Sequence, residues 1–433
     1  MTLKSKYYIW LITFMLCTLH LTAQTTTSRQ SSHLSVAPAE SMGMSSERLE
    51  RIDNMLKQSL VDNTIPGAVA LIARNGKIVF HEAYGNAEAN GKKLKRDAIF
   101  RIASQSKAIT STAVMMLWEE GKFRLDDPIS QYIPEFKNPE VLVNFKYADT
   151  TYTTRPANKE ITIRHLLTHT SGIGYGAIDK DERMKMIYDK AGTIDLFTTA
   201  PFTIKDVVLK RAQVPLHHNP GEQYTYSLGL DVLGYFVEVI SGMTFQDYLL
   251  KHLFIPLGMN DTNFYFSASK SDRLVAIQHK VNDRWENYPN TFYDVNYPIE
   301  GAKTFFSGGA GLSSTAKDYA TFLQMFLNGG ELNGKRFLSR TTIASMMGNQ
   351  TGDLYGGGDQ YYGLAFGVLT EQGQAKGGLG SQGTFIWGGY FNTQYFADPK
   401  ENLIGIILKQ TQGSTGDQTS WKFKQMVEAS IDD

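Results

Sequence analysis

Strand-rich segments stand at both ends of this chain, and a middle dominated by helices and loops separates them. Near the N-terminus, two β-rich runs within residues 68–85 flank Asn75-Gly76, a dipeptide that tolerates the positive φ angles of a tight hairpin. Near the C-terminus, residues 384–411 predict further strands with a turn at "DPKEN", and residues 420–431 predict a closing helix. We therefore predict an α/β (α+β) fold in which both ends build one antiparallel sheet flanked by helices.

This arrangement predicts one domain over residues 41–433 with a long insertion. We expect the sheet subdomain at about 41–106 and 300–433, and a large, mainly helical insertion at about 107–299. The chain has 433 residues and is 42% hydrophobic, which suffices for a large core.

The first residues have the pattern of an export signal. Two lysines precede an apolar stretch over residues 7–21, which is too short and too interrupted for a membrane span, and Ala23 fits a cleavage site. We predict a signal peptide over residues 1–23, a periplasmic or secreted mature chain, and no stable membrane span once the signal is removed. Residues 24–40 are rich in Ser, Thr, Gln and Ala and predict a flexible leader.

The only cysteine, Cys17, lies inside this signal. Leu16 precedes it where a lipoprotein signal would have a small residue, which disfavours lipid attachment. Removal of the signal would leave a chain without disulfides, without a thiol nucleophile and without cysteine-bound metal.

The charge balance argues against one class of partner. Lys and Arg total 43, Asp and Glu also total 43, and no long run of one sign occurs. Such a chain has no basic field that would attract nucleic acid or an anionic membrane, so we expect no nucleic-acid partner.

The stretch "FRIASQSKAITSTAVMMLWEEG", from Phe100 to Gly121, places Ser104 and Lys107 one turn apart at the start of an almost wholly apolar helix. The helix N-terminus would stabilise negative charge near Ser104. Burial would lower the pKa of Lys107, so that its amine could take the proton of the serine hydroxyl. The alternative is that Ser104 is a plain helix cap and Lys107 a surface residue.

A second stretch, "NPGEQYTYSLGLDVLGYFVEVISG", places Tyr226 just before another apolar helix. A tyrosine there can shuttle protons if a nearby cation lowers its pKa. The alternative is a tyrosine that only packs its ring.

A third stretch, Trp387-Gly388-Gly389-Tyr390, lies on a predicted C-terminal strand. Two glycines inside a strand often mark the close approach of a ligand or of another backbone. A backbone N–H there could join the Ser104 N–H in holding an oxyanion. The alternative is a β-bulge with a packed tryptophan.

Together these stretches resemble the serine β-lactamase and penicillin-binding-protein superfamily in its class C branch, and within it the family VIII carboxylesterases and β-lactamase-related serine hydrolases. The resemblance runs from about Ser41 to the C-terminus and implies a β-lactamase/transpeptidase-like fold. It rests on six blocks in the family's order: "IFRIASQSKAITS", "LLTHTSGIGYG", "PGEQYTYSLGLDVLG", "FIPLGMNDT", "GAGLSSTAKDYATFLQMFLNGG" and "WGGYFNTQYFADPKENL".

The resemblance implies a role for each matching residue. Ser104 matches the acylated nucleophile, Lys107 the base that activates it, and Tyr226 the tyrosine that relays protons, including the one from the deacylating water. The family uses no metal and no organic cofactor for this chemistry, so none is expected here.

The third stretch matches the place of the Lys-Thr-Gly motif of β-lactamases. By that match Trp387, Gly388 and Gly389 border the substrate, and the Tyr390 N–H is the second oxyanion donor beside that of Ser104.

Two departures from the β-lactamase pattern bear on the substrate. Leu228 stands where those enzymes have an asparagine that holds the substrate's side-chain amide, and Trp387 stands where a lysine attracts the β-lactam carboxylate. The chain thus keeps the acylation residues and lacks β-lactam recognition, which favours a neutral acyl ester.

The remaining candidates receive lesser roles. The resemblance makes His169 a structural residue of the "LLTHTSG" turn rather than a triad base. His217 and His218 lie near Tyr226 in sequence and could line the cleft, but we expect them to be solvated loop residues. The loops at 179–201 and 348–363 are expected to shape the pocket, and three tyrosines of the second loop could line it: Tyr355, Tyr361 and Tyr362.

The sequence thus predicts an exported serine hydrolase of carboxylesterase type, which cleaves an ester or amide through an acyl-Ser104 intermediate. Its partner would be a small-molecule ester, amide or peptide. The alternatives are a class C-like β-lactamase or D-amino-acid peptidase acting on cell-wall peptides, and a catalytically idle cell-wall-binding protein.

Overall fold

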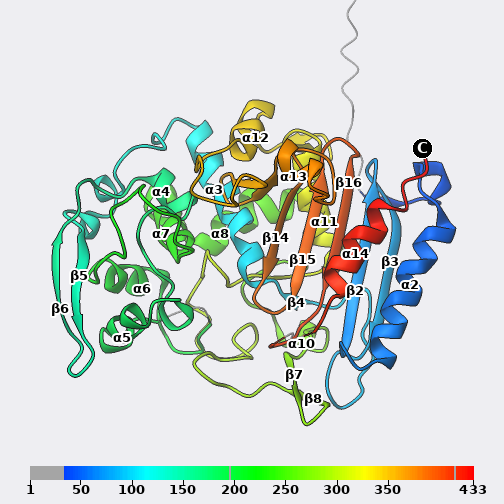
Figure 1. Cartoon of the computed structure of the whole chain (residues 1–433), viewed down its shortest axis with the longest axis horizontal. Helices are drawn as coiled ribbons and strands as arrows, with labels where there is room; N and C mark the ends of the chain where they lie inside the picture. Colours follow the sequence, from blue (N-terminus) through cyan, green and yellow to red (C-terminus); the bar gives the residue numbers. More distant parts are fainter. Residues whose placement is uncertain (1–33, 195–196, 414–415) are drawn as a thin grey trace, which may run out of the picture.

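The computed structural model describes residues 34–194, 197–413 and 416–433, so the predicted signal peptide lies outside the described residues. Its centre is an eight-stranded sheet in the order β1-β3-β2-β16-β15-β14-β13-β12 (Figure 1). Neighbouring strands are antiparallel except for the parallel pair β1 and β3. The strands are β1 Ser35–Val36, β3 Lys77–Gly85, β2 Gly67–Arg74, β16 Leu403–Leu408, β15 Thr393–Asp398, β14 Phe385–Gly389, β13 Gly367–Leu369 and β12 Gln360–Tyr362.

The two ends of the chain meet in the middle of this sheet. β16 pairs along its whole length with β2, from Leu403 opposite Arg74 to Leu408 opposite Val69. Both strands are buried on both faces, and their runs of Val, Ile, Leu and Ala are those of a central strand. The predicted fold class, one antiparallel-dominated sheet built from both ends and flanked by helices, is confirmed.

Helices cover both faces of the sheet. α2 (Ser46–Val61) and α14 (Thr419–Glu428) lie side by side on one face, and α11 (Ala316–Leu327) packs against β2 and β16 on the other (Figure 1). Leu49, Ile52 and Leu56 of α2 recur at helical spacing and are buried. α3 (Ser106–Glu119) is buried nearly all round, as its apolar sequence predicts.

The region between α3 and α11 is mainly helical but also contains two hairpins. The first hairpin, β5 with β6, lies at the end of the molecule far from α2 (Figure 1). The helices and turns are η3 Ile129–Gln131, η4 Pro134–Phe136, α4 Ile163–Leu167, η5 Gly176–Ile178, α5 Glu182–Lys190, α6 Ile204–Arg211, α7 Gly229–Ser241, α8 Phe245–Leu249, the π-helical turn η6 Leu250–Phe254, α9 Ile255–Leu257 and α10 Ala268–Ser271. The hairpin strands are β5 Glu140–Lys146, β6 Thr151–Pro156, β7 Gln278–Val281 and β8 Arg284–Asn287.

Short elements complete the fold. Two further strand pairs occur, β4 with β9 and β10 with β11. These elements are η1 Glu40–Met42, β4 Phe100–Arg101, η2 Ala103–Gln105, β9 Ser313–Ser314, β10 Glu331–Leu332, β11 Lys335–Arg336, α12 Arg340–Met347 and α13 Glu371–Ala375. The predicted subdomain boundaries stay a prediction.

The prediction of a flexible leader over residues 24–40 is wrong for its last part, residues 34–40. Leu34 is buried, Ser35–Val36 form β1, and the Ala37 N–H donates to the Ile78 carbonyl at 3.0 Å. The reason is that edge strand β3 offers unpaired backbone groups, which these residues satisfy. Residues 34–40 therefore belong to the sheet domain.

No helix within residues 34–194, 197–413 and 416–433 combines the length and the apolar composition needed to cross a bilayer.

Candidate active site

Ser104 and Lys107 meet where η2 runs directly into α3. Ser104 lies in η2 and Lys107 in the first turn of α3, and both side chains are buried. Lys107 Nζ donates a hydrogen bond to Ser104 Oγ at 3.3 Å. The alternative of a surface lysine beside a plain helix cap is therefore wrong.

The backbone before Ser104 has an uncommon conformation. Ala103 has φ +44°, in the left-handed region, which costs a non-glycine residue about 1–3 kcal/mol. Such strain persists only where surrounding contacts hold it, and it recurs at functional sites. Here β4 pairs with β9 on one side of the turn and α3 begins on the other.

Lys107 is fully buried, and its amine has three hydrogen-bond acceptors. Nζ donates to the Gly309 carbonyl at 2.7 Å, to Tyr175 Oη at 3.1 Å and to Ser104 Oγ at 3.3 Å. An ammonium group has three N–H donors, so this set of acceptors satisfies the charged form completely.

The pKa of Lys107 differs from the sequence expectation. Burial acts to lower it, but the phenols of Tyr175 and Tyr226 act in the opposite direction and leave the pKa of Lys107 above its usual value. The expectation of a lowered pKa is therefore wrong. The physical reason is that the fold surrounds the buried amine with oxygen acceptors.

Tyr226 lies against Lys107, as the resemblance implies. Lys107 Nζ is 4.7 Å from the centroid of the Tyr226 ring, within cation–π range. The chain places Tyr226 shortly before α7, whose apolar face packs against α3 and α4. The hydroxyl, amine and phenol named from the sequence thus converge at one place.

Tyr175 is the site residue that the sequence did not single out. Its ring stacks on Tyr226 with centroids 5.2 Å apart, and its hydroxyl accepts a hydrogen bond from Lys107. Burial raises the pKa of Tyr175, and the Lys107 charge opposes that shift. A signal was present, since Tyr175 is the last residue but one of the block "LLTHTSGIGYG". Its distance along the chain from Ser104 concealed its position.

The strand β14 borders Ser104 from the opposite side. A Cβ on Gly389 would lie 2.4 Å from the Ile102 carbonyl oxygen, two residues before Ser104. Only glycine permits this approach, which explains the glycine at this strand position. Tyr390 follows directly, half-buried, with its hydroxyl accepting from Gln412 Nε2 at 3.2 Å. The role of its N–H as a second oxyanion donor stays a prediction.

The other predicted substrate contacts fall in two environments. The Trp387 ring lies 5.9 Å from Tyr226 and 5.2 Å from Tyr362. With Gly388 and Tyr355 it also lines a cavity of about 550 Å³ that extends to α14 and that none of Ser104, Lys107 and Tyr226 lines. Leu228 is only 2% exposed and packs in an apolar cluster with Ala103 and Tyr226. Leu228 therefore supports the site from behind.

Aromatic side chains enclose the space beside Tyr226. Tyr355 packs against Tyr224 at 4.8 Å, Tyr361 is partly buried, and Tyr362 is fully buried. Tyr355 can border a substrate, whereas Tyr362 lies beneath the surface. Tyr175, Tyr224 and Tyr226 line a smaller cavity of about 280 Å³.

The three candidate histidines lie in two different environments, and His169 is the one that contacts Tyr226. His169 is buried with φ +57°, its Nδ1 lies 3.0 Å from Ser227 Oγ, and its ring packs 4.6 Å from Tyr226. Burial and the nearby Lys107 charge hold the pKa of His169 well below its usual value. His169 thus supports Tyr226 as a neutral group.

The expectation that His217 and His218 are solvated is wrong. His217 Nε2 pairs with Asp179 Oδ2 at 3.0 Å, and His218 is 5% exposed with Nε2 2.9 Å from Thr225 Oγ1. His217 thus joins its loop to Asp179, whereas His218 is held within its own loop.

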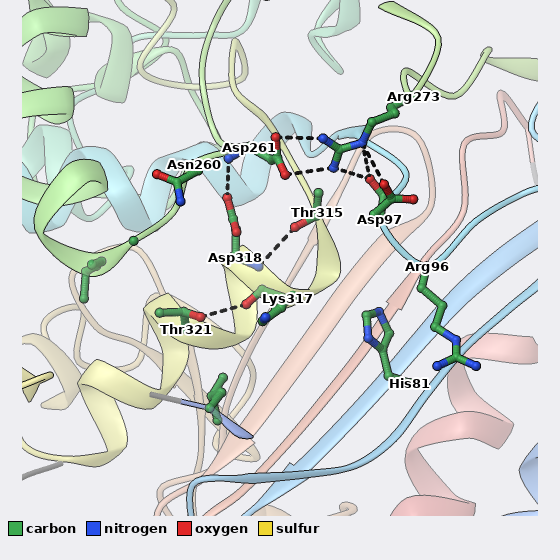
Figure 2. Close-up of a pocket in the computed structure, with 13 residues that line it drawn as sticks. His81, Arg96, Asp97, Asn260, Asp261, Arg273, Thr315, Lys317, Asp318 and Thr321 are labelled. Atoms are coloured by element: carbon green, nitrogen blue, oxygen red, sulfur yellow. Dashed lines mark hydrogen bonds and ion pairs between the residues drawn. The ribbon is translucent and has the colours of Figure 1, made fainter. Parts of the chain in front are cut away.

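Another cavity, of about 610 Å³, lies apart from this site. None of Ser104, Lys107 and Tyr226 lines it. Figure 2 shows that its charged groups are mostly paired, with Arg273 held by Asp261 and Asp97, and Asp318 accepting from the Asp261 backbone. Because its charged groups already pair with one another, this cavity is a weaker candidate for the active site than the region around Ser104.

The assembled group can perform acyl transfer. A buried serine hydroxyl accepts a hydrogen bond from an amine that also contacts the Gly309 carbonyl and two phenols, and β14 approaches the backbone of η2. The hydroxyl can act as a nucleophile, and the amine and phenols as groups that handle its proton.

Comparisons with known proteins agree with this geometry. A family model described as Beta-lactamase matches residues 52–427. The chain is 33% identical over 362 residues to Protein Rv1367c of Mycobacterium tuberculosis, which covers 80% of this chain and 86% of that protein. It is 30% identical over 392 residues to Esterase EstB of Burkholderia gladioli, which covers 85% of this chain and 92% of the esterase.

Solved structures show the same fold. EstCE1, described as a hydrolase with promiscuous acyltransferase activity, superposes with a TM-score of 0.71 at 27% identity and covers 88% of this chain and 98% of EstCE1. Simvastatin synthase LovD from Aspergillus terreus superposes with a TM-score of 0.73 at 21% identity, covering 89% of this chain and 99% of LovD, and that likeness concerns the fold alone. With the family model matching from Ile52 to Val427, the chain belongs to the beta-lactamase family and is a serine hydrolase.

Proposed function

We propose that this protein is a carboxylesterase-type hydrolase that cleaves a neutral ester or amide through an acyl-Ser104 intermediate. The observation that supports this most is the contact of Ser104 Oγ with Lys107 Nζ, with Tyr226 against the same amine. The 30% identity to an esterase along most of both chains points the same way.

The reaction follows from the geometry. Once the Lys107–Tyr226 pair has lost one proton, it accepts the Ser104 proton as Oγ bonds to the substrate carbonyl carbon. The N–H groups of Ser104 and Tyr390 hold the resulting oxyanion. The pair then gives the proton to the leaving alcohol or amine as its bond to the acyl carbon breaks. Water adds by the same steps and releases the acid, leaving Ser104 protonated.

The walls of the site favour a neutral substrate over a β-lactam. Trp387 supplies no positive charge, and Leu228, which lies behind the wall, supplies no amide; a charged hydrogen bond contributes about 1.5–3 kcal/mol. The aromatic rings of Trp387, Tyr355 and Tyr226 instead offer apolar contact area.

Mutation of the nucleophile tests this function. Ser104→Ala is expected to lower the rate of p-nitrophenyl ester hydrolysis by about 10³-fold or more and to abolish labelling by a fluorophosphonate. Mass spectrometry of the wild-type protein should find the label on the peptide that contains Ser104. Unchanged turnover in the variant, or no acyl-Ser104 at all, would leave an idle binding protein as the better account.

A substrate panel separates the alternatives within the enzyme class. Esters are expected to exceed nitrocefin and D-alanyl peptides in kcat/KM. Nitrocefin or D-peptide hydrolysis at rates that equal the best ester would favour the β-lactamase or D-amino-acid peptidase function.

We also propose export, on the basis of the N-terminal sequence alone. The lysines, the apolar stretch and Ala23 fit a cleaved signal that directs the chain to the periplasm or the medium. N-terminal sequencing of the protein from its cell fractions should find a mature chain that starts near residue 24. A cytosolic chain that still begins at Met1 would contradict this.

A further inference from the structure

Asp231, a buried carboxylate of α7, lies against the loop that holds Lys107. Its side chain is 2% exposed, and its Oδ1 accepts hydrogen bonds from Ser307 Oγ at 2.6 Å and from the Gly309 N–H at 3.3 Å. Lys107 Nζ donates to the carbonyl of the same Gly309 at 2.7 Å. Asp231 thus accepts from the N–H of Gly309, and Lys107 donates to the carbonyl of the same residue.

Gly309 lies beside both charges. A Cβ at this position would lie 2.6 Å from Asp231 Oδ2 and 3.6 Å from Lys107 Nζ. Both charged groups therefore approach the same backbone atom. Because both are buried, their attraction is weakly screened.

The loop around Gly309 is fixed from both sides, so this arrangement is held. Thr110 Oγ1 of α3 donates to the Gly308 carbonyl at 2.6 Å, and Ser106 Oγ accepts from the Leu312 N–H at 3.1 Å. Asp231 and Ser307 hold the loop from the α7 side. α3 and α7 also pack directly against each other.

We propose that Asp231 is the counter-charge and positioning residue of Lys107, which keeps Lys107 as an ammonium in the resting enzyme and presents the Gly309 carbonyl to it. The inference rests on the proposed function, in which the Lys107–Tyr226 pair takes the proton of Ser104. It assigns to Asp231 the control of when that pair can accept a proton.

Other titratable groups also face Lys107 in the part of the chain that the structure describes, namely Tyr175, Tyr226 and His169. Tyr175 and His169 are uncharged near neutral pH, because burial raises the pKa of the phenol and lowers that of the imidazole. Tyr175 raises the pKa of Lys107 through its oxygen, but near neutral pH neither Tyr175 nor His169 carries a negative charge. The proposal assigns that charge to the buried carboxylate of Asp231.

The test is the titration of Lys107 itself, observed by NMR of protein labelled with ¹³C at the lysine Cε and assigned with Lys107→Met. In Asp231→Asn, which keeps the shape and an acceptor oxygen, the midpoint of the Lys107 signal is expected to fall by about one to three pH units. The acid limb of kcat/KM for a p-nitrophenyl ester should move by the same amount.

Two controls separate charge from packing. Ser307→Ala removes a hydrogen bond to Asp231 and keeps its charge, so the Lys107 midpoint should stay in place even if kcat falls. Asp318→Asn removes a different buried carboxylate, in the separate cavity of Figure 2, and should also leave the midpoint unmoved.

An unchanged Lys107 midpoint in folded Asp231→Asn would overturn the proposal, and so would an equal shift in Asp318→Asn. If Asp231→Asn does not fold, as judged by circular dichroism, the smaller Asp231→Ser replaces it with the same expected shift. The NMR readout needs no turnover. A wild-type protein without esterase activity would therefore end the proposed function and still leave this inference open to confirmation or refutation.

Discussion

Lys107 is buried at the centre of the site with its three N–H groups hydrogen-bonded, and its pKa lies above the usual lysine value. Near neutral pH the amine is therefore protonated, and only a minority of molecules can accept the Ser104 proton. Because that minority grows about tenfold per pH unit, log kcat/KM for a neutral ester should rise steadily from about pH 6 to about pH 10. A pH series corrected for spontaneous hydrolysis measures this. A flat profile between about pH 6 and pH 8 would mean that Lys107 is already neutral.

The two tyrosines beside Lys107 should differ in their effect. Tyr226→Phe removes the proposed proton relay and should lower kcat by about 10²–10⁴-fold with little change in KM. Tyr175→Phe removes one acceptor of the buried ammonium, which destabilises the charged form by about 1–3 kcal/mol and should shift the pH profile of kcat/KM to lower pH rather than abolish turnover. Steady-state kinetics of both variants, with folding checked by circular dichroism, decide this. A larger loss in Tyr175→Phe would transfer the relay to Tyr175.

For single residues, the sequence predicted which side chains form the site better than it predicted what surrounds them. Ser104, Lys107 and Tyr226 were identified because their spacing relative to apolar helices is local information. The Lys107 pKa was misjudged because its acceptors, Tyr175 and Gly309, come from distant segments. His217 was expected in solvent because nothing near it in sequence reveals Asp179 as its partner.

Among the elements, the contact of β14 with η2 determines whether the second oxyanion donor stays near Ser104. A methyl group on Gly389 would meet the Ile102 carbonyl at 2.4 Å, so Gly389→Ala should push the two backbones apart. We expect kcat to fall by about 10²-fold, the loss seen when one oxyanion donor is removed, with KM less affected.

Gly348→Ala is the matched control for this change. Its added Cβ would have no neighbour closer than 3.4 Å, so activity should stay near wild type. Equal activities of the Gly389 and Gly348 variants would show that the contact of β14 with η2 is not needed for catalysis.

The element boundaries show where sequence patterns suffice. The helix over α7 and the hairpin of β2 and β3 follow from periodicity and from Asn75-Gly76, since both signals lie within the element. β1 was missed because two residues of strand have no pattern of their own. They are ordered by the edge of β3, which is contributed by another part of the chain.

For the whole molecule, Arg74 connects segments from both ends of the chain. Its guanidinium is 6% exposed, pairs with Glu401 and Asp433, and donates to the carbonyls of Met42 and Gly43. Hydrogen bonds to charged groups contribute about 1.5–3 kcal/mol each, so Arg74→Ala should lower the free energy of unfolding by about 2 kcal/mol or more. Urea denaturation followed by circular dichroism measures this.

The control for Arg74 is Arg51→Ala, which breaks the exposed pair with Glu47 on α2. Exposed pairs of this kind contribute little, so the urea midpoint should stay within error of wild type. A similar small effect for Arg74→Ala would mean that the β2–β16 pairing alone joins the two ends.

The pairing of β16 with β2 also determines when, during synthesis, the sheet can be completed. A chain that leaves the ribosome from its N-terminus presents the hydroxyl of Ser104 long before β14, β15 and β16 exist to complete the sheet. Until then the nascent polypeptide has its nucleophile but lacks the backbone amide that follows β14. Acylation should therefore begin only after synthesis has passed these strands, so the enzyme is protected from reacting prematurely by its own topology.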